Sequence, residues 1–292
     1  MLSLFFSKLL LCHGGIKTLF CECNQRRLII VLCGALTILW TSYISAENSE
    51  KIISSSETQT LKAKVAQATR MLVREGLLAS SGHVSARIPG TNKVLIGPRD
   101  VSRAILQAEH IVTVDLDSNK VDGDRNPPRE TEIHTGIYRA RPDVMSVIHT
   151  HPIHSVIFSI TGKPIVPVIV HGAIFGKGVP VHNHVGHINS RELGNELASV
   201  LGDSQAILMK MHGAVIVGPS IERAFAYSLH LEENAEKQLL AEASGSTVTG
   251  MTPAEVERCI ELSFGDRSIE KRWRYYAKKE VSSKKSRNLK SQ

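Results

Sequence analysis

The sequence predicts an α/β layered protein with one domain over residues 58–265. Short strand patterns alternate with amphipathic helix patterns along this whole stretch, and no internal repeat is visible. The composition agrees, because 42% hydrophobic and 22% charged residues are typical of a globular protein and exclude a disordered chain or a multi-span membrane protein.

The first half of this domain is predicted to combine two helices with short strands. Thr58–Glu75 carries apolar residues at the spacing of one helix face, and Gly76 follows as a stop signal. Val94–Ile96 and Ile111–Leu116 have the pattern of short strands. A second helix is expected from about Arg129 to Arg141, because two prolines precede it and another follows.

The second half is predicted to contain two strand regions and three helices. Helix starts are expected at Asn189 or Ser190 and at Ser220, whose side chains can accept hydrogen bonds from the first free N–H groups. The expected elements are a strand at Val144–His151, a helix to Leu201 with Leu193, Leu197 and Val200 inward, a hairpin of Ala206–Met209 and Ala214–Val217, and helices to about Ala243 and over Pro253–Leu262.

Residues 1–57 are predicted to lie outside the domain, as a targeting, anchoring or extraneous segment. Leu28–Ala46 contains no charge and follows two arginines, which is typical of a signal-peptide hydrophobic region or a short membrane anchor. The 27 residues before it are many for a charged leader, so a mis-assigned start codon is the alternative. Four of the five cysteines lie here, so the body is not expected to depend on disulfides.

Residues 266–292 are predicted to form a basic C-terminal tail. From Lys271 onward nine Lys and Arg residues face one acid, Glu280, so this end accounts for the net charge of +7. Such an end is most often solvated and partly disordered, and contact with nucleic acid or acidic lipid is the less favoured alternative. We therefore expect no nucleic-acid partner, and membrane contact only through the N-terminal segment.

Two histidines at the end of a predicted strand are candidate metal ligands. The spacing i, i+2 places His149 and His151 on the same face, although an isolated His-x-His is more often part of a polar turn. His212 is the best candidate for a third ligand, because it lies at a strand end beside a glycine. Three histidines would leave a coordination position open for substrate. Spacing alone does not exclude the competing histidines, which are His154, His171, His182, His184 and His187.

Other polar residues are candidates for proton transfer or substrate binding. Glu130 and Glu132 lie in the first turn of a predicted helix, where the helix dipole stabilises an acid by up to about 1 kcal/mol. Position alone therefore favours a structural role for both. His83, Arg99 and Arg129 lie in loops containing Gly or Pro, and together they could bind an anionic substrate.

Five motifs in order resemble those of the class II aldolase/adducin family, over roughly residues 58–245. The resemblance implies a three-layer α/β/α sandwich, a homotetramer with sites between subunits, and a cytoplasmic location. The motifs are Ser81-Gly82-His83-Val84-Ser85, Pro128-Arg129-Glu130, Tyr138-x-x-Arg141-Pro142-Asp143, His149-Thr150-His151 and His212-Gly213.

The resemblance also implies roles for individual residues. His149, His151 and His212 would bind a divalent metal, usually zinc and sometimes manganese. Glu130 falls on the family's catalytic acid/base position and Glu132 does not, which reverses the interpretation from position alone. His171 lies close to where the aldolases place a tyrosine that donates a proton.

Departures from the sugar-phosphate members bear on the substrate. Those members usually have Asn at the position of His83, and small hydroxyl residues or glycine where this chain has Pro98-Arg99 and Pro128-Arg129. A phosphate cradle is normally made of backbone N–H groups and small polar side chains. The departures favour a carboxylate on a flat ring, and the stretch from Ser81 to Arg87 is similar to the decarboxylating branch.

The predicted function is that of a divalent-metal-dependent carbon–carbon lyase acting through a metal-stabilised enolate. The expected substrate is a small anion, a hydroxy-(hetero)aromatic or keto acid that loses CO2. Glu130 would move the proton, and His83, Arg99 and Arg129 would hold a spectator carboxylate. The alternatives are an aldolase or epimerase of a sugar phosphate, and an adducin-like scaffold without catalysis.

Overall fold

The computed structural model describes residues 54–290 of the 292-residue chain. Leu28–Ala46, the predicted signal or anchor segment, lies outside the described residues. Within residues 54–290, none of the helices has the length and apolar character needed to cross a membrane.

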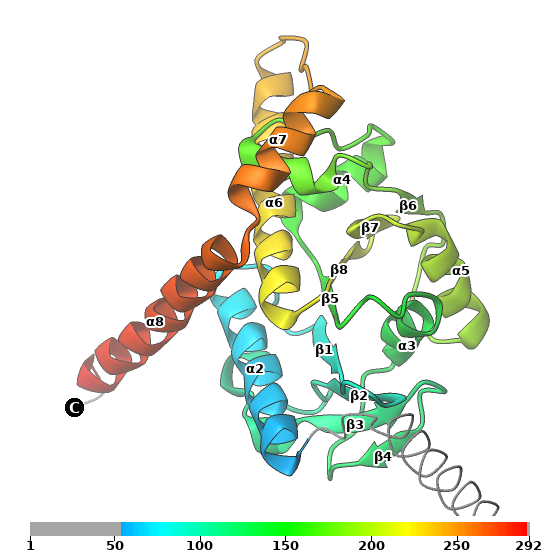
Figure 1. Ribbon diagram of the computed structural model, residues 1–292, viewed down its shortest axis with the longest axis vertical. Helices are drawn as coiled ribbons and strands as arrows, with labels where there is room; N and C mark the ends of the chain where they lie inside the picture. Colours follow the sequence, from blue (N-terminus) through cyan, green and yellow to red (C-terminus); the bar gives the residue numbers. More distant parts are fainter. Residues whose placement is uncertain (1–53, 291–292) are drawn as a thin grey trace, which may run out of the picture. The chain divides into compact units, whose positions relative to one another are not determined.

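A mixed sheet forms the centre of the domain (Figure 1). Its eight strands have the order β4-β3-β2-β1-β5-β8-β7-β6, and only the β6–β7 pair is parallel. The strands are β1 (His83–Arg87), β2 (Lys93–Ile96), β3 (Val112–Asp115), β4 (Lys120–Asp122), β5 (Ser146–Thr150), β6 (Val181–His182), β7 (Ala206–Met209) and β8 (Gly213–Gly218).

Helices cover both faces of this sheet, which confirms the predicted α/β/α arrangement. The helices α2, α4 and α6 pack on one face, whereas α3 and α5 pack against each other and against the other face (Figure 1). The helices are α2 (Ser55–Arg74), α3 (Thr131–Ala140), α4 (Ile153–Thr161), α5 (Arg191–Leu201), α6 (Ile221–Ala243), α7 (Pro253–Ser263) and α8 (Asp266–Lys290), with 3-10 turns η1 (Arg103–Ile105), η2 (Ala108–His110) and η3 (Val170–Phe175).

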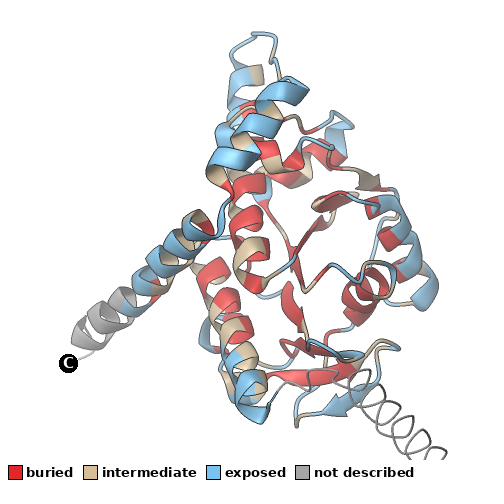
Figure 2. Ribbon diagram, in the orientation of Figure 1, coloured by how far each residue is buried: buried red, intermediate tan, exposed pale blue. Residues whose placement is uncertain are grey.

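The central strands are buried on both faces (Figure 2). Successive side chains of each strand point to opposite faces, so they pack against one helical layer or the other in turn. In β5, Ile148 packs in the core beneath α2, and Val147 packs in the core beneath α3 and α5. His149 lies two residues after Val147 and therefore projects toward the layer of α3. The same parity places His83 and Ser85 of β1 on that face, since β1 and β5 pair His83 with His149.

The start of the domain differs from the prediction by a few residues. The helix α2 begins at Ser55 because Ser54 and Glu57 form a capping box. The Ser54 hydroxyl accepts the Glu57 N–H, and the Glu57 carboxylate accepts the Ser54 N–H. The predicted boundary between residues 57 and 58 thus falls inside the first helix.

The structure departs from local sequence pattern at two places in the second half. Despite its β-branched composition, 165–170 forms no strand, because side chains of α6 take its backbone N–H groups. Val166 and Val168 donate to Gln238 and Asn234 at 3.0 and 2.9 Å. In α5, Val200 was expected to face inward but is 39% exposed.

The basic C-terminal segment is a helix with one face packed on the domain, so residues 266–281 do not form the partly disordered tail that was expected. The buried side chain of Ile269 and the half-buried Trp273 and Tyr276 recur at helical spacing on one face of α8. Glu280 is buried and binds Arg70 of α2 at 2.6 Å. The many basic residues of this segment make its narrow apolar stripe difficult to recognise in the sequence.

Candidate metal centre

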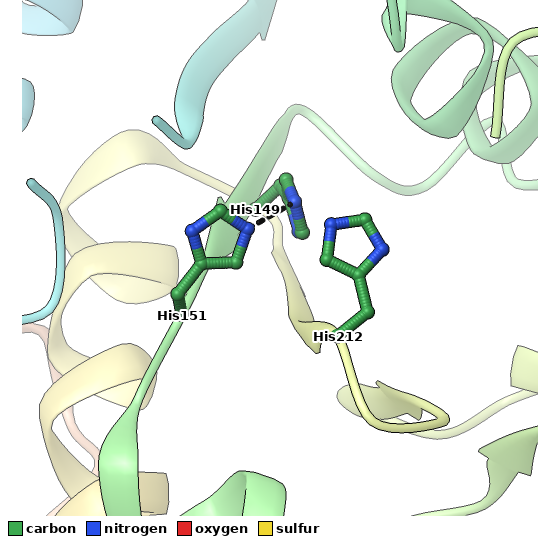
Figure 3. A group of neighbouring side chains, drawn as sticks. All are labelled: His149, His151 and His212. Carbon is green, nitrogen blue, oxygen red and sulfur yellow. Dashed lines mark hydrogen bonds between the residues drawn. The ribbon is translucent and has the colours of Figure 1, made fainter. Parts of the chain in front are cut away.

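Three histidines converge where β5 ends and β8 begins (Figure 3). His149 lies in β5, His151 just after it, and His212 in the turn before β8; the antiparallel register pairs Thr150 with Ala214. The Nε2 atoms of His149 and His151 are 3.1 Å apart, and the His212 ring lies 5.1 and 5.2 Å from the other two. One nitrogen from each ring lies within 4.8 Å of the others.

Gly213 makes this convergence possible. A Cβ atom at this position would clash with the Thr150 carbonyl oxygen and would lie 2.8 Å from the His151 ring and 3.0 Å from the His149 ring. Any larger residue would push β8 away from the end of β5. The glycine that follows His212 in the sequence therefore provides space for the other two imidazoles.

Hydrogen bonds hold the Nδ1 side of each ring and leave Nε2 available. His149 Nδ1–H donates to the Ala214 carbonyl at 3.1 Å, and His212 Nδ1–H donates to the Gly186 carbonyl at 2.9 Å. His151 Nδ1 lies 2.8 Å from the Ser81 hydroxyl. Metal-binding histidines usually have such a partner, because it sets the tautomer and the ring orientation.

The environment favours the uncharged, metal-binding form of His149 and His151. Burial lowers the pKa of His149 well below its usual value, and the neighbouring rings of His83, His151 and His212 lower it further. Burial also lowers the pKa of His151, followed by the effect of His212. Uncharged imidazoles with oriented Nε2 atoms are a suitable donor set for a divalent metal.

A buried carboxylate, that of Glu130, faces the triad. Its Oε2 atom lies 3.8 Å from His149 Nε2 and its Oε1 atom lies 3.8 Å from His212 Nε2. Oε1 also accepts the Ile188 N–H at 3.2 Å. Glu130 was predicted in the first turn of a helix, but α3 begins at Thr131 and the Glu130 side chain does not cap it. The carboxylate is therefore directed at the histidines and not at the helix N–H groups.

Glu132 has a different environment, although it lies only two residues further on. Its carboxylate accepts hydrogen bonds from Arg139 at 2.9 Å and from the Ser118 hydroxyl at 2.7 Å. These contacts connect α3 to the turn between β3 and β4. These contacts support the structural interpretation of Glu132.

His187 is a residue near the site that the sequence analysis did not select. Its Nδ1 lies 3.2 Å from Glu130 Oε1, and its ring lies 5.8 Å from that of His212. Its side chain is 72% exposed, which places it at the mouth of the site. It was one of several competing histidines, and nothing in its spacing distinguished it.

The predicted substrate-binding residues differ in their distance from the triad. His83 pairs with His149 across β1 and β5, and the ring centroids are 5.6 Å apart. Its buried Nδ1 has no hydrogen-bond partner among residues 54–290. Burial lowers its pKa well below the usual value, with His134 and Arg103 adding to the effect. His83 thus presents an uncharged ring beside the candidate metal ligands.

Arg99 and Arg129 lie in two neighbouring loops. The Arg99 N–H donates to the Asn126 carbonyl at 2.9 Å, which joins the loops, and both side chains are exposed. In the described part of the chain neither side chain has a polar partner. The buried Arg103, which the sequence analysis missed, instead supports this region by donating to the Gly82 carbonyl at 3.2 Å.

His171 does not contact the triad within this chain. It lies in η3, its ring stacks on His230 of α6 at 4.4 Å, and Arg272 of α8 donates to its Nε2 at 3.0 Å. The predicted role of His171 as a proton donor stays a prediction.

Comparison with known proteins agrees with this architecture. A mixed sheet between helical layers is the class II aldolase type of fold, and residues 63–239 match the family described as Class II Aldolase and Adducin N-terminal domain. The chain belongs to the class II aldolase/adducin family.

Two relatives indicate the range of activities in this family. The chain is 29% identical over 225 residues to a 3,4-dihydroxyphthalate decarboxylase of Arthrobacter keyseri, covering 72% of this chain and 90% of that protein. It is 31% identical over 170 residues to an L-fuculose phosphate aldolase of Methanocaldococcus jannaschii, covering 57% and 88%. Both relatives are lyases.

A solved structure shows the same fold. An aldolase II superfamily protein from Pseudomonas syringae superposes with a TM-score of 0.70 at 23% identity, covering 82% of this chain and 97% of that one. At this identity the likeness establishes the fold alone.

Proposed function

We propose that this protein is a divalent-metal-dependent carbon–carbon lyase that decarboxylates a hydroxy-(hetero)aromatic or keto acid. The observation that carries the proposal is the convergence of three oriented imidazoles with the Glu130 carboxylate 3.8 Å from two of them. The similarity to a 3,4-dihydroxyphthalate decarboxylase supports decarboxylation.

The three histidines would hold the metal, with zinc favoured and manganese as the alternative. A nitrogen-only donor set suits zinc well, and three protein ligands leave room for substrate oxygens. When bound, the metal supplies Lewis acidity, which stabilises negative charge on a substrate oxygen.

Glu130 is the residue we assign to proton transfer. In a decarboxylation it would deliver a proton to the carbon that loses CO2, and in an aldol cleavage it would remove a hydroxyl proton. The Ile188 N–H donates to Oε1, so the hydrogen bond that orients the carboxylate leaves Oε2 toward His149. Glu130 is only 7% exposed, which restricts water around its carboxylate.

His83, Arg99 and Arg129 would bind the spectator carboxylate of the substrate. The His83 ring lies 5.6 Å from that of His149, and its Nδ1 has no partner among the described residues, so it would contact the part of the substrate near the reacting carbon. The exposed guanidinium groups of Arg99 and Arg129 would close over the carboxylate from the adjoining loops, since an arginine fork matches a carboxylate. A homotetramer would be needed for His171 to act as proton donor, in the site of a neighbouring subunit.

A second candidate is the aldol cleavage of a sugar phosphate, which the similarity to an L-fuculose phosphate aldolase favours. Both reactions use a metal centre and a proton-transfer residue, so the triad and Glu130 do not separate them. A non-catalytic scaffold is the third candidate, and it would not need metal.

The test is a parallel assay of the metal-loaded protein on hydroxy-substituted aromatic acids, keto acids and sugar phosphates, with CO2 and aldehyde release both followed. We expect CO2 from one of the acids and no aldehyde. Aldehyde release from a sugar phosphate would instead establish the aldolase. Purified protein with no bound metal and no turnover on either panel would favour the scaffold.

A further inference from the structure

The helix α4 contacts both loops that carry the candidate metal ligands lying outside the strands, His151 and His212. It begins directly after the first loop, because Pro152 occupies the position before its first turn. Its second half meets the other loop, where the Ser159 hydroxyl accepts the Met211 N–H at 3.0 Å. The helix therefore connects two loops, each of which places one imidazole.

The start of α4 depends on a carboxylate from another helix. Pro152 provides no side-chain cap, and the first turn of α4 contains no acid. The Glu232 carboxylate of α6 takes this role, since Oε1 accepts the His154 N–H at 2.8 Å and Oε2 accepts the Ser155 N–H at 2.9 Å. The side chains of the same two residues also donate to it, at 2.9 and 2.7 Å.

These four hydrogen bonds fix the point at which α4 begins. A carboxylate at a helix N-terminus is stabilised by the free N–H groups and by the helix dipole. The Glu232 side chain is only 16% exposed, so water cannot freely replace it. Because Pro152 precedes the capped turn and His151 precedes Pro152, the backbone position of His151 is linked to that of Glu232.

The second loop contains a strained residue beside the ligand. Met211 has a φ of +57°, in the left-handed region that favours glycine. A larger residue keeps this conformation only where its surroundings hold it. Ser159 provides the hold, because it accepts the Met211 N–H and donates to the Val156 carbonyl at 2.7 Å. His212 is the next residue, so its direction depends on this contact.

We propose that Glu232 and Ser159 are positioning residues, which set the separation of His151 and His212 through α4. The inference rests on the histidine triad being the metal site of the proposed function. Ligands already held at the right separation bind a metal without the cost of ordering them first. The hydrogen bonds to the ring Nδ1 atoms set the ring orientations, whereas α4 sets the backbone positions from which two of the rings project.

The experiment measures zinc affinity and stability separately on the full-length protein. Competition with a chelating dye gives the zinc affinity of the folded protein, and urea unfolding of the metal-free protein gives its stability. Glu232→Gln should weaken zinc affinity about 10- to 100-fold, the usual effect of losing support around a ligand, because its amide nitrogen cannot accept hydrogen bonds. Ser159→Ala should act in the same direction, and bound cobalt should show an altered visible absorption in both variants.

A purely structural role predicts a different result. It would lower the free energy of unfolding of the metal-free protein but leave the zinc affinity and the cobalt spectrum unchanged, which would overturn the proposal. Glu236→Gln is the matched control, since it removes the same charge from α6 one turn further along, at an exposed position. It should bind zinc as the unchanged protein does, and an equal loss in this control would also overturn the proposal.

A second substitution tests the route through the strained residue. Glycine adopts the left-handed conformation without strain, so adding Met211→Gly to Ser159→Ala should restore part of the lost affinity. No recovery would mean that Ser159 does not act through Met211. If His149→Ala abolishes zinc binding while Glu232→Gln and Ser159→Ala bind normally, only this inference fails. If the unchanged protein binds no zinc, the proposed function fails with it.

Discussion

Two separate histidine clusters in the described part of the chain look alike by proximity but differ in chemistry. In the first, one ring nitrogen each of His149, His151 and His212 lies within 4.8 Å of the others. In the second, ring nitrogens of His171 and His230 and a carboxylate oxygen of Glu233 lie equally close. In the first cluster the Nδ1 atoms contact a hydroxyl or carbonyls and the Nε2 atoms converge. In the second, an arginine occupies one ring nitrogen of His171.

This difference shows that closeness of potential ligands is not enough to define a metal site. Each imidazole has one nitrogen that could bind a metal and one that contacts another protein group. That contact decides whether the metal-binding nitrogen is available and whether the ring stays uncharged. The nearby charges also differ: the Glu130 carboxylate faces the first cluster, whereas the second contains the Glu233 carboxylate and contacts the Arg272 guanidinium.

The largest difference in bound metal is expected between variants that each lack one histidine, one from each cluster. His149→Ala should lose its bound metal, because only two imidazoles would remain. His171→Ala should keep the metal content of the unchanged protein. Elemental analysis of the purified variants measures both. Normal metal content in His149→Ala would refute the assigned ligand set.

The next contrast is between two glutamates of the same segment. Glu130→Gln should retain metal but lower kcat by about 10²- to 10⁴-fold, which is the usual contribution of a general acid or base. Glu132→Gln should leave kcat within a few-fold, since its carboxylate binds Arg139 and Ser118. Steady-state kinetics on the substrate found in the panel assay tests this pair, and an undiminished rate in Glu130→Gln would exclude its proposed role.

A smaller effect is expected at the hydroxyl that orients His151. Ser81→Ala removes the partner of His151 Nδ1 and should weaken metal affinity by about 10- to 100-fold, the usual effect of losing such a contact. Ser80→Ala, at the exposed neighbouring position, is the control and should bind metal normally. Competition with a metal-sensitive chelating dye gives both affinities, and equal values would mean that the hydroxyl does not orient the ring.

The buried His230 of the second cluster should make the stability of the protein sensitive to acid. Burial, with Arg272 and His171 adding to it, lowers the pKa of His230 to about 2. The unfolded chain protonates this residue near pH 6.5 while the folded chain does not, so the free energy of unfolding falls as the pH drops below about 6.5.

The expected loss from His230 is about 1.4 kcal/mol per pH unit. Urea unfolding between pH 7 and pH 5 measures it, and His230→Gln should show a shallower decline than the unchanged protein. Equal slopes in the two proteins would mean that His230 does not remain uncharged in the folded state.

Much of the fold was predictable because its signals are local. The serines at 190 and 220 cap α5 and α6 as expected, and the hairpin of β7 and β8 was recognised from its apolar runs. The capping box at Ser54 is an equally local signal that was overlooked. The strand β1 was missed because its polar residues, His83 and Ser85, face α3 instead of solvent.

The candidate site was predictable to the extent that its residues lie in recognisable motifs. The spacing of His149 and His151, the glycine after His212 and the resemblance to a known family were enough to name the triad and Glu130. Periodicity placed Glu130 and Glu132 in one helical turn, and only the family resemblance separated them.

Contacts between distant residues decided the rest. Glu130 faces the triad because it precedes Thr131, the first residue of α3. Glu132 lies within α3 and binds Arg139 and Ser118. Arg272 meets His171 across 101 residues of sequence, which no local pattern can express. The sequence by itself determined which residue types are available for chemistry, through short-range spacing and helix signals. The tertiary structure decided which ring nitrogens are free and which charges face them, because burial and hydrogen bonding depend on packing between elements far apart in the chain.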